Sequence, residues 1–200
     1  MLGLDVKFDA LNELLTAELA EVESRFAAEL HSDVACVNDL VRHIERYRGK
    51  MLRPLLLLIC GRAAASDAPF TDAHRTLAAV VEMVHMATLV HDDILDEADT
   101  RRQGETVNAL RGNEAAVMLG DYLISHSYHL CSSIDSQAAA RLIAAATNTV
   151  CEGELLQLHN RYNWSIDEQT YFDIIQRKTG ALCGVACRLG ALASGANKPT

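Results

Sequence analysis

Apolar residues recur at helical spacing along nearly the whole chain, whereas the alternation typical of β-strands is almost absent. Near the start, for example, Leu11, Leu14, Leu15, Leu19 and Val22 form one apolar stripe. Only three prolines interrupt the 200 residues, and half of the residues are apolar although only 5% are aromatic. This composition is typical of a helical protein and excludes a disordered chain or a many-stranded sandwich. We therefore predict an all-α fold of about seven or eight helices.

Short polar turns separate the predicted helices. After the first helix, the expected ranges are about 33–47, 52–65, 72–97, 113–132, 136–158 and 165–193. We expect Ser32 or Asp33 to cap the second helix, and Ser165 with Glu168 to form a capping box for the last one. Residues 52–65 are apolar on nearly every face, which predicts a buried central helix. Residues 99–112 indicate a functional loop and 194–200 a terminal loop, and we expect residues 1–200 to form a single domain.

Charge and cysteine content narrow the classes of partner and compartment. The chain has 27 acidic and 18 basic side chains, a formal net charge of −9, which argues against nucleic acid or an anionic membrane as the main partner. The six cysteines form no C-x-x-C pair, and we interpret Cys183 and Cys187 as buried thiols in preference to half of a metal site. The longest apolar run, Leu55–Cys60, is too short to span a bilayer. We expect a cytoplasmic protein without a transmembrane segment.

The most informative stretch is the acidic one at the end of the predicted helix over 72–97. On a helix, Asp92 and Asp96 lie one turn apart, and Asp99 would share their face if the helix extended that far. Such carboxylates repel one another and oppose the helix dipole, so stability alone does not favour them. A divalent cation bound between these carboxylates would offset their repulsion. Oxygen ligands without adjacent Cys or paired His favour Mg²⁺, which carboxylates commonly hold together with substrate phosphates.

Basic residues accompany this acidic stretch. Arg101 and Arg102 follow it directly, and cations beside a metal-binding cluster suit a phosphorylated ligand. The alternative is a solvated helix end with a local salt-bridge network. Further along, Lys178 and Thr179 lie in a mostly apolar helix, where polar side chains need a partner such as a phosphate.

A second basic cluster precedes the predicted helix over 52–65. Gly49 permits close backbone approach, and Lys50 and Arg53 lie one turn apart at the helix N-terminus. Backbone donors, helix dipole and two cations together can hold a diphosphate. Taken alone, the segment is explained slightly better by ordinary residues at a helix end.

In order and spacing, these motifs resemble the trans-polyprenyl diphosphate synthase family, in particular its octaprenyl-like, long-chain members. The matching pieces are G-K-x-x-R-P (49–54), E-x-x-H-x-A-T-L-x-H-D-D-x-x-D (82–96), R-R (101–102), T-V-N (106–108), G-N-x-x-A-V (112–117), G-D-Y-L (120–123), E-G-E (152–154) and K-T-G (178–180). They span roughly two thirds of the chain. The aspartate motif alone is moderately specific, whereas the ordered set is highly specific.

The resemblance implies an isoprenoid-synthase-type helical bundle around a central cavity, usually homodimeric. It also implies a Mg²⁺-dependent prenyltransferase that condenses isopentenyl diphosphate with an allylic diphosphate such as farnesyl diphosphate. By the family's pattern, Mg²⁺ would be held against the allylic diphosphate by Asp92, Asp93 and Asp96. The same diphosphate would contact Arg101, Lys178 and Thr179, and Lys178 would count with the aspartates as catalytic. Isopentenyl diphosphate would be bound by Gly49, Lys50, Arg53, His85 and Arg102.

The resemblance further implies the class of product. In this family, bulky residues four or five positions before the first aspartate close the tunnel floor, and this chain has Thr88 and Ala87 there. Small residues at these positions favour products of about C30 to C50. The alternative is that Ala87 only allows two helices to pack closely.

Two features depart from the family's pattern. No second D-D-x-x-D motif follows K-T-G, since the last aspartate is Asp173. We therefore expect a bundle that is incomplete at the C-terminus, with greatly reduced turnover by these 200 residues. Gln103 and Glu105 also differ from the residues common in this loop. A non-catalytic relative that binds a prenyl diphosphate or dimerises with a complete synthase is the alternative, and the two basic clusters disfavour a sesquiterpene cyclase.

Other residues carry weaker signals. His126 and His129 lie one turn apart, but without a carboxylate nearby in the sequence a surface or capping role is favoured over a metal site. We expect Trp164 to anchor packing, and Glu154 with Gln157 to line the cavity.

Overall fold

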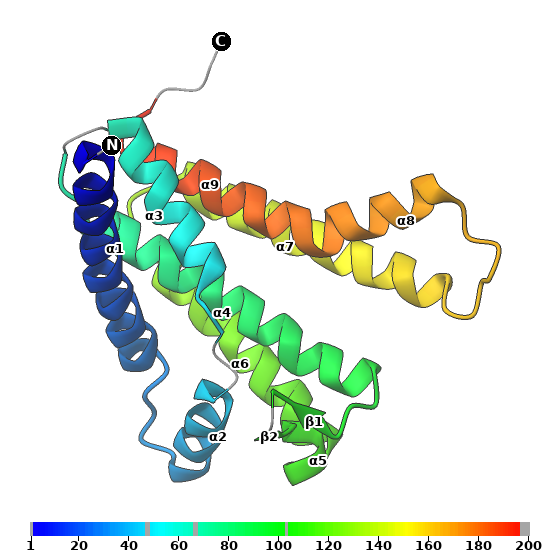
Figure 1. Ribbon diagram of the computed structural model, residues 1–200. Helices are drawn as coiled ribbons and strands as arrows, with labels where there is room; N and C mark the ends of the chain where they lie inside the picture. The colour runs from blue at the N-terminus through cyan, green and yellow to red at the C-terminus, as the bar shows by residue number, and fades with distance from the viewer. Residues whose placement is uncertain (1, 47–48, 66–67, 103, 197–200) are drawn as a thin grey trace.

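The computed structural model describes residues 2–46, 49–65, 68–102 and 104–196, with side chains from residue 9 onward (Figure 1). Its helices are α1 (Leu2–Glu29), α2 (Ala35–Glu45), α3 (Leu52–Ala65), α4 (Asp72–Leu95), α5 (Val107–Arg111), α6 (Asn113–Ser132), α7 (Gln137–His159), α8 (Glu168–Ile175) and α9 (Ala181–Ala193). The predicted all-α fold is confirmed. The predicted helix end at Tyr47, the departure at Gln103 and residues 197–200 lie outside the described residues.

Two short elements interrupt this helical architecture. A π-helical turn, η1 (Gln176–Gly180), separates α8 from α9, where the sequence predicts one unbroken helix. After α4, β1 (Thr100–Arg101) pairs antiparallel with β2 (Gly104–Glu105). The predicted loop over 99–112 therefore contains a small ribbon and α5, which Thr106 caps by accepting a hydrogen bond from Ala109 N at 3.3 Å.

The core is centred on α4. Nearly every side chain from Leu77 to Val90 is buried, because α1, α3, α6 and α9 all pack against this helix. Figure 1 shows α4 and α6 running side by side, while α7 and α8 extend outward as an arm. The prediction of a buried central helix over 52–65 is wrong for α3, whose Leu52 and Ile59 are exposed. Its buried side, with Leu57 and Leu58, packs mainly against α9.

Several local expectations also need correction. Val34 is the N-cap of α2 and makes no side-chain capping bond. Neither Ser32 nor Asp33 caps the helix, and Ser32 N donates to Asn38 Oδ1 at 3.0 Å instead. At α8, Asp167 is the N-cap and accepts from Thr170 N at 2.7 Å, so the predicted Ser165–Glu168 capping box is wrong. A carboxylate in this position is the stronger acceptor for the orphan N–H.

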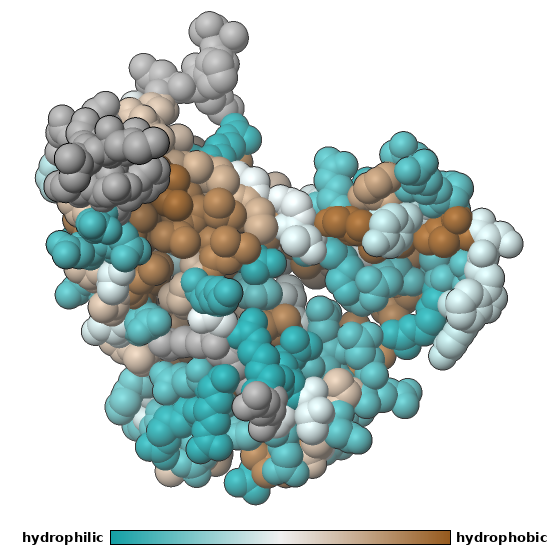
Figure 2. All heavy atoms as spheres, in the orientation of Figure 1, coloured by the Kyte–Doolittle hydropathy of each residue, from teal (hydrophilic) through white to brown (hydrophobic). Residues whose placement is uncertain are grey.

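Apolar side chains are exposed on the α7–α8 arm, as the brown residues there in Figure 2 illustrate. They are Leu155, Tyr171, Phe172 and Ile175. Trp164, in the turn before α8, is 94% exposed, so its predicted packing role is wrong. Cys183 and Cys187 are half-buried on α9, not fully buried as predicted. Within the described residues, no helix combines the length and hydropathy that crossing a bilayer requires.

Candidate active site

The predicted aspartates lie where α4 ends. Asp92 is half-buried in the last turn, and Asp96 is exposed and caps the helix, with its N–H donating to Asp92 O at 2.8 Å. Glu97 then takes a left-handed conformation with φ 50°. Because the helix stops here, the conditional expectation that Asp99 shares the aspartate face is wrong. Asp99 instead accepts a hydrogen bond from Thr106 N at 3.0 Å through its carbonyl.

Asp93 points away from the other two aspartates. One residue along a helix turns the side chain by about 100°, and this carboxylate is 99% buried against Arg101. Its Oδ1 accepts from Arg101 Nε at 2.8 Å and lies 2.7 Å from Nη2. Among the described residues, Oδ2 has no hydrogen-bond partner. A buried acceptor left unpaired is costly, which is typical of a site that receives a ligand.

Lys178 reaches the aspartates from η1. Its Nζ lies 3.9 Å from Asp92 Oδ2 and pairs closely with Glu154 of α7, so three separate segments converge here. Close approach of η1 to α7 depends on Gly153, where an added Cβ would lie 2.6 Å from Arg177 Cβ and 2.9 Å from Lys178 N. The π turn also rotates Lys178 relative to the α8 face. Glu154 therefore orients Lys178, a more specific role than lining a cavity.

Burial and neighbouring carboxylates set the electrostatics of this cluster. Burial raises the pKa of Asp92 to about 6, with Glu154 and Asp96 adding to the rise and Lys178 opposing it. Arg161, just beyond α7, donates to Leu95 O at 3.0 Å and to Asp96 Oδ1 at 3.3 Å. The sequence analysis did not identify Arg161, and its spacing from the aspartates carries no signal. Three carboxylates against two cations leave an excess of oxygen ligands, which fits Mg²⁺.

The second predicted cluster gathers around His85, two turns before Asp92 on α4. Burial lowers the pKa of His85 to about 3, and the positive charges of Arg53, Arg102 and Arg101 lower it further. The imidazole is therefore neutral. The Nε of Arg53 is buried without a hydrogen-bond partner among the described residues. An added Cβ at Gly49 would lie only 2.5 Å from Arg102 Nη1, so the glycine and this guanidinium are in direct contact.

The remaining predicted residues differ in their surroundings. Lys50 and Thr179 are both exposed. Ala87 is fully buried within α4, and Thr88 is half-buried with its hydroxyl donating to His85 O at 2.7 Å. The role of Ala87 and Thr88 in product length stays a prediction.

Backbone strain is concentrated beside the two clusters. Met51, Glu97 and Arg102 have φ values of 50°, 50° and 47°. Left-handed conformations cost a non-glycine residue roughly 1 kcal/mol or more, and such residues cluster at functional sites. All three adjoin predicted ligand-binding residues, in the segments just before α3 and just after α4.

Comparison with known proteins shows the family to which the chain belongs. Residues 34–200 match the family model described as polyprenyl synthetase. The chain is 34% identical over 190 residues to octaprenyl diphosphate synthase of Escherichia coli K12, covering 95% of this chain and 58% of that protein. It is 33% identical over 194 residues to heptaprenyl diphosphate synthase component 2 of Geobacillus stearothermophilus, covering 97% and 60%.

Solved structures give the same result. A polyprenyl synthase from Caulobacter crescentus CB15, complexed with calcium and isoprenyl diphosphate, matches with TM-score 0.88 and 34% identity, over 94% of this chain and 57% of that one. A decaprenyl diphosphate synthase from Rhodobacter capsulatus matches with TM-score 0.87 and 34% identity, over 95% and 58%. The chain thus spans less than two thirds of these relatives' length. Since the family model covers most of the chain and the identity extends along nearly all of it, the chain belongs to the polyprenyl synthetase family.

Proposed function

We propose that this chain carries the diphosphate-binding part of a trans-prenyltransferase, which joins isopentenyl diphosphate to an allylic diphosphate such as farnesyl diphosphate. The observation that supports this most directly is the pairing of two unlike clusters on one face of α4. His85 and Asp92 are seven residues apart, so they share a helix face and are separated by about 10 Å along the axis. One cluster is rich in carboxylates and the other in guanidinium groups, which suits two diphosphates held in different ways.

The carboxylate cluster is proposed to receive the allylic diphosphate. Asp92 and Asp96 would hold Mg²⁺, whereas Asp93, which points away from them and is buried against Arg101, would position that guanidinium. The metal neutralises the diphosphate and makes it a better leaving group. Lys178, now paired with Glu154, is within reach of a phosphate near Asp92. Thr179 and Arg101 would add further donors to the same phosphate oxygens.

The guanidinium cluster is proposed to bind isopentenyl diphosphate through Arg53, Arg102, Lys50 and the backbone at Gly49. Neutral His85 can donate one hydrogen bond to a phosphate oxygen without a proton being taken up. In the reaction, the allylic C–O bond breaks and the diphosphate leaves. The double bond of isopentenyl diphosphate forms the new C–C bond, and a proton is lost from the product.

The products and the assembly are also proposals. The octaprenyl and heptaprenyl names of the relatives, together with small Ala87 and Thr88, support products of about C30 to C50. Large exposed apolar side chains on α6, Val117 and Met118, support a homodimer, because such surfaces mark interaction sites. A cytoplasmic location remains a prediction from the sequence.

The proposal is tested by titrating the chain with a non-hydrolysable thio analogue of farnesyl diphosphate, with and without Mg²⁺. We expect Mg²⁺-dependent binding that weakens by about tenfold or more in Asp92→Asn, because one metal ligand is lost. Asp99→Asn is the matched control, with the same charge change outside the helix face, and should bind as the parent does. Equal binding by the parent and Asp92→Asn would refute the assignment of the aspartate site.

Adding isopentenyl diphosphate to the natural allylic substrate tests the reaction itself. Elongated product supports the transferase, and Ala87→Phe is then expected to shorten that product.

A further inference from the structure

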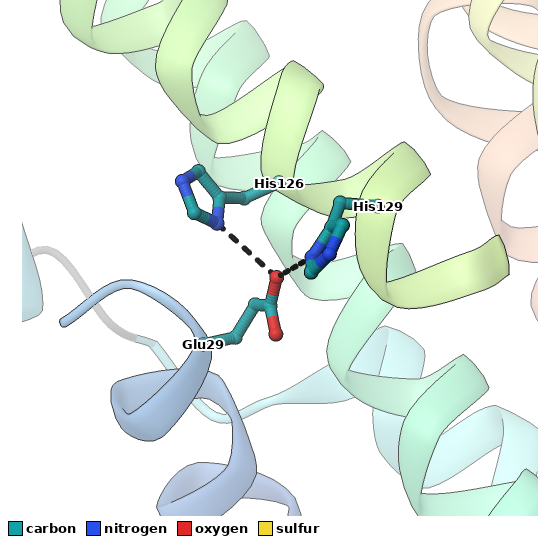
Figure 3. Close-up of side chains that lie close together, drawn as sticks. All are labelled: Glu29, His126 and His129. Atoms are coloured by element: carbon teal, nitrogen blue, oxygen red, sulfur yellow. Dashed lines mark hydrogen bonds and ion pairs between the residues drawn. The ribbon is translucent and has the colours of Figure 1, made fainter. Parts of the chain in front are cut away.

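A second cluster of ligand-type side chains lies where the end of α1 meets α6 (Figure 3). Glu29 is the last residue of α1, and its Oε1 lies 3.1 Å from His126 Nδ1 and 2.7 Å from His129 Nδ1. Both histidines point from successive turns of α6 toward this single oxygen. The expectation that no carboxylate accompanies the histidines is therefore wrong, since Glu29 is distant only in sequence.

The surrounding contacts hold this cluster in place. The ring of Tyr122, one turn earlier on α6, packs on His126 with centroids 4.2 Å apart, and its hydroxyl donates to Leu30 O at 3.3 Å. Leu30 is fully buried, so the end of α1 is fixed against α6. Glu29 and His126 have side chains only 15% and 27% exposed, whereas His129 is 77% exposed. Two ligands are thus preorganised, and the third can adjust from the solvent side.

The chemistry of the three side chains fits a transition-metal ion. One ligand atom from each lies within 4.8 Å of the other two. Two imidazole nitrogens and one carboxylate oxygen are the donor set of many three-ligand zinc sites, which leave a fourth position to water. Around tetrahedral Zn²⁺ with bonds near 2.0–2.1 Å, ligand atoms are about 3.3 Å apart. The observed separations of 2.7 Å (His129) and 3.1 Å (His126) must open by about 0.6 and 0.2 Å, and the exposure of His129 permits the larger movement.

We propose that Glu29, His126 and His129 bind one divalent transition-metal ion of the zinc type and so clamp α1 to α6. Imidazole ligands favour such a borderline ion over Mg²⁺, which prefers oxygen alone. The site draws on α1 and α6, which supply none of the residues assigned to the diphosphates. Its test therefore stands apart from the test of the proposed function.

The experiment uses the purified chain with any affinity tag removed and metals stripped by a chelator. Co²⁺ absorption and Zn²⁺ calorimetry measure stoichiometry and affinity, in a background with exposed Cys36 and Cys151 replaced by serine so that thiolates do not compete. We expect one equivalent with the d–d spectrum of nitrogen and oxygen ligands. A rise in the thermal unfolding midpoint on adding Zn²⁺ should accompany binding.

Variants decide where the ion binds. His129→Gln and Glu29→Gln should weaken Zn²⁺ binding by about tenfold or more. Because the His129 side chain is exposed, its replacement should leave the fold intact, which circular dichroism can check. His159→Gln, which removes another exposed histidine at a helix end, is the matched control and should retain binding, as should Asp92→Asn. Absence of Zn²⁺ binding would show a hydrogen-bonded cluster only and overturn the proposal. Binding unchanged in His129→Gln, or a thiolate charge-transfer band, would overturn it equally.

Discussion

Gly153 offers the sharpest test of how the site is assembled. In Gly153→Ala, the new Cβ would lie 2.6 Å from Arg177 Cβ and 2.9 Å from the backbone nitrogen of Lys178. Carbon atoms in favourable contact are about 3.5–4.0 Å apart, so η1 must move away from α7 by about 1 Å. Lys178 would then lose its close pairing with Glu154.

The magnitude follows from two opposing effects. Replacing a helical glycine by alanine is favourable by roughly 1 kcal/mol, whereas overpacking of this kind costs about 1–3 kcal/mol. We therefore expect Gly153→Ala to lower the free energy of unfolding by about 0–2 kcal/mol. Gly184→Ala on α9 is the matched control, because a Cβ there meets no atom within 4 Å. That variant should gain roughly 0.5–1 kcal/mol.

Urea denaturation followed by circular dichroism measures both variants, and titration with the thio analogue measures the site. Gly153→Ala should bind the analogue more weakly than the parent, whereas Gly184→Ala should bind it normally. If both alanine variants gain stability and bind equally well, Gly153 does not control the approach of η1, and the reasoning is refuted.

Three further variants test packing and electrostatics. Gly190→Ala places a Cβ against the carbonyl oxygen of Leu57 and should cost about 3 kcal/mol in urea denaturation; an unchanged midpoint would contradict the close α3–α9 packing. His85 has a pKa of about 3 in the folded protein, whereas an unperturbed histidine has a pKa of 6.5. As the pH is lowered between these values, the unfolded chain takes up a proton and the folded protein does not, so the free energy of unfolding decreases. At pH 5 the loss in the free energy of unfolding is about 2 kcal/mol. His85→Gln should remove this part of the pH dependence, and equal dependence of unfolding free energy on pH in the parent and the variant would disprove the assignment. Glu18→Gln removes the negative charge and one of the two oxygens that accept from Arg75 at 2.6 and 2.8 Å, and it should cost about 1–2 kcal/mol by thermal unfolding, whereas an unaffected midpoint would show that the pair contributes little.

The sequence predicts what is local and periodic. The apolar pattern over 72–97 identifies α4 (Asp72–Leu95) to within two residues, and the carboxylates of its last turn and C-cap mark the end that we propose binds the allylic diphosphate. The spacing of Asp92 and Asp96 also places both on one turn. The pattern does not show that the chain folds back after α4 through the β1–β2 ribbon. The pairing of Arg101 with Asp93 is therefore seen only in the structure.

Pairings between distant segments are the other part that periodicity leaves out. Glu154 and Lys178 are separated by the end of α7, a turn and α8. The sequence gives each a reason to be polar without showing that they meet. Glu29 lies 97 residues before His126, which hides the carboxylate that completes that cluster. Helix caps fail for a different reason. Ser165 and Asp167 are both good N-caps, and the choice depends on where α8 begins.

The irregular parts of the backbone explain why the site is less predictable than the bundle. Met51, Glu97 and Arg102 are left-handed and adjoin the two clusters, and the π turn at Gln176–Gly180 carries Lys178. Each departs from the backbone conformation that its local sequence favours, so a prediction from sequence propensities does not find it. Regular helices thus supply the frame, and the segments that depart from helical geometry carry the cations that lie near Asp92 and His85 of α4.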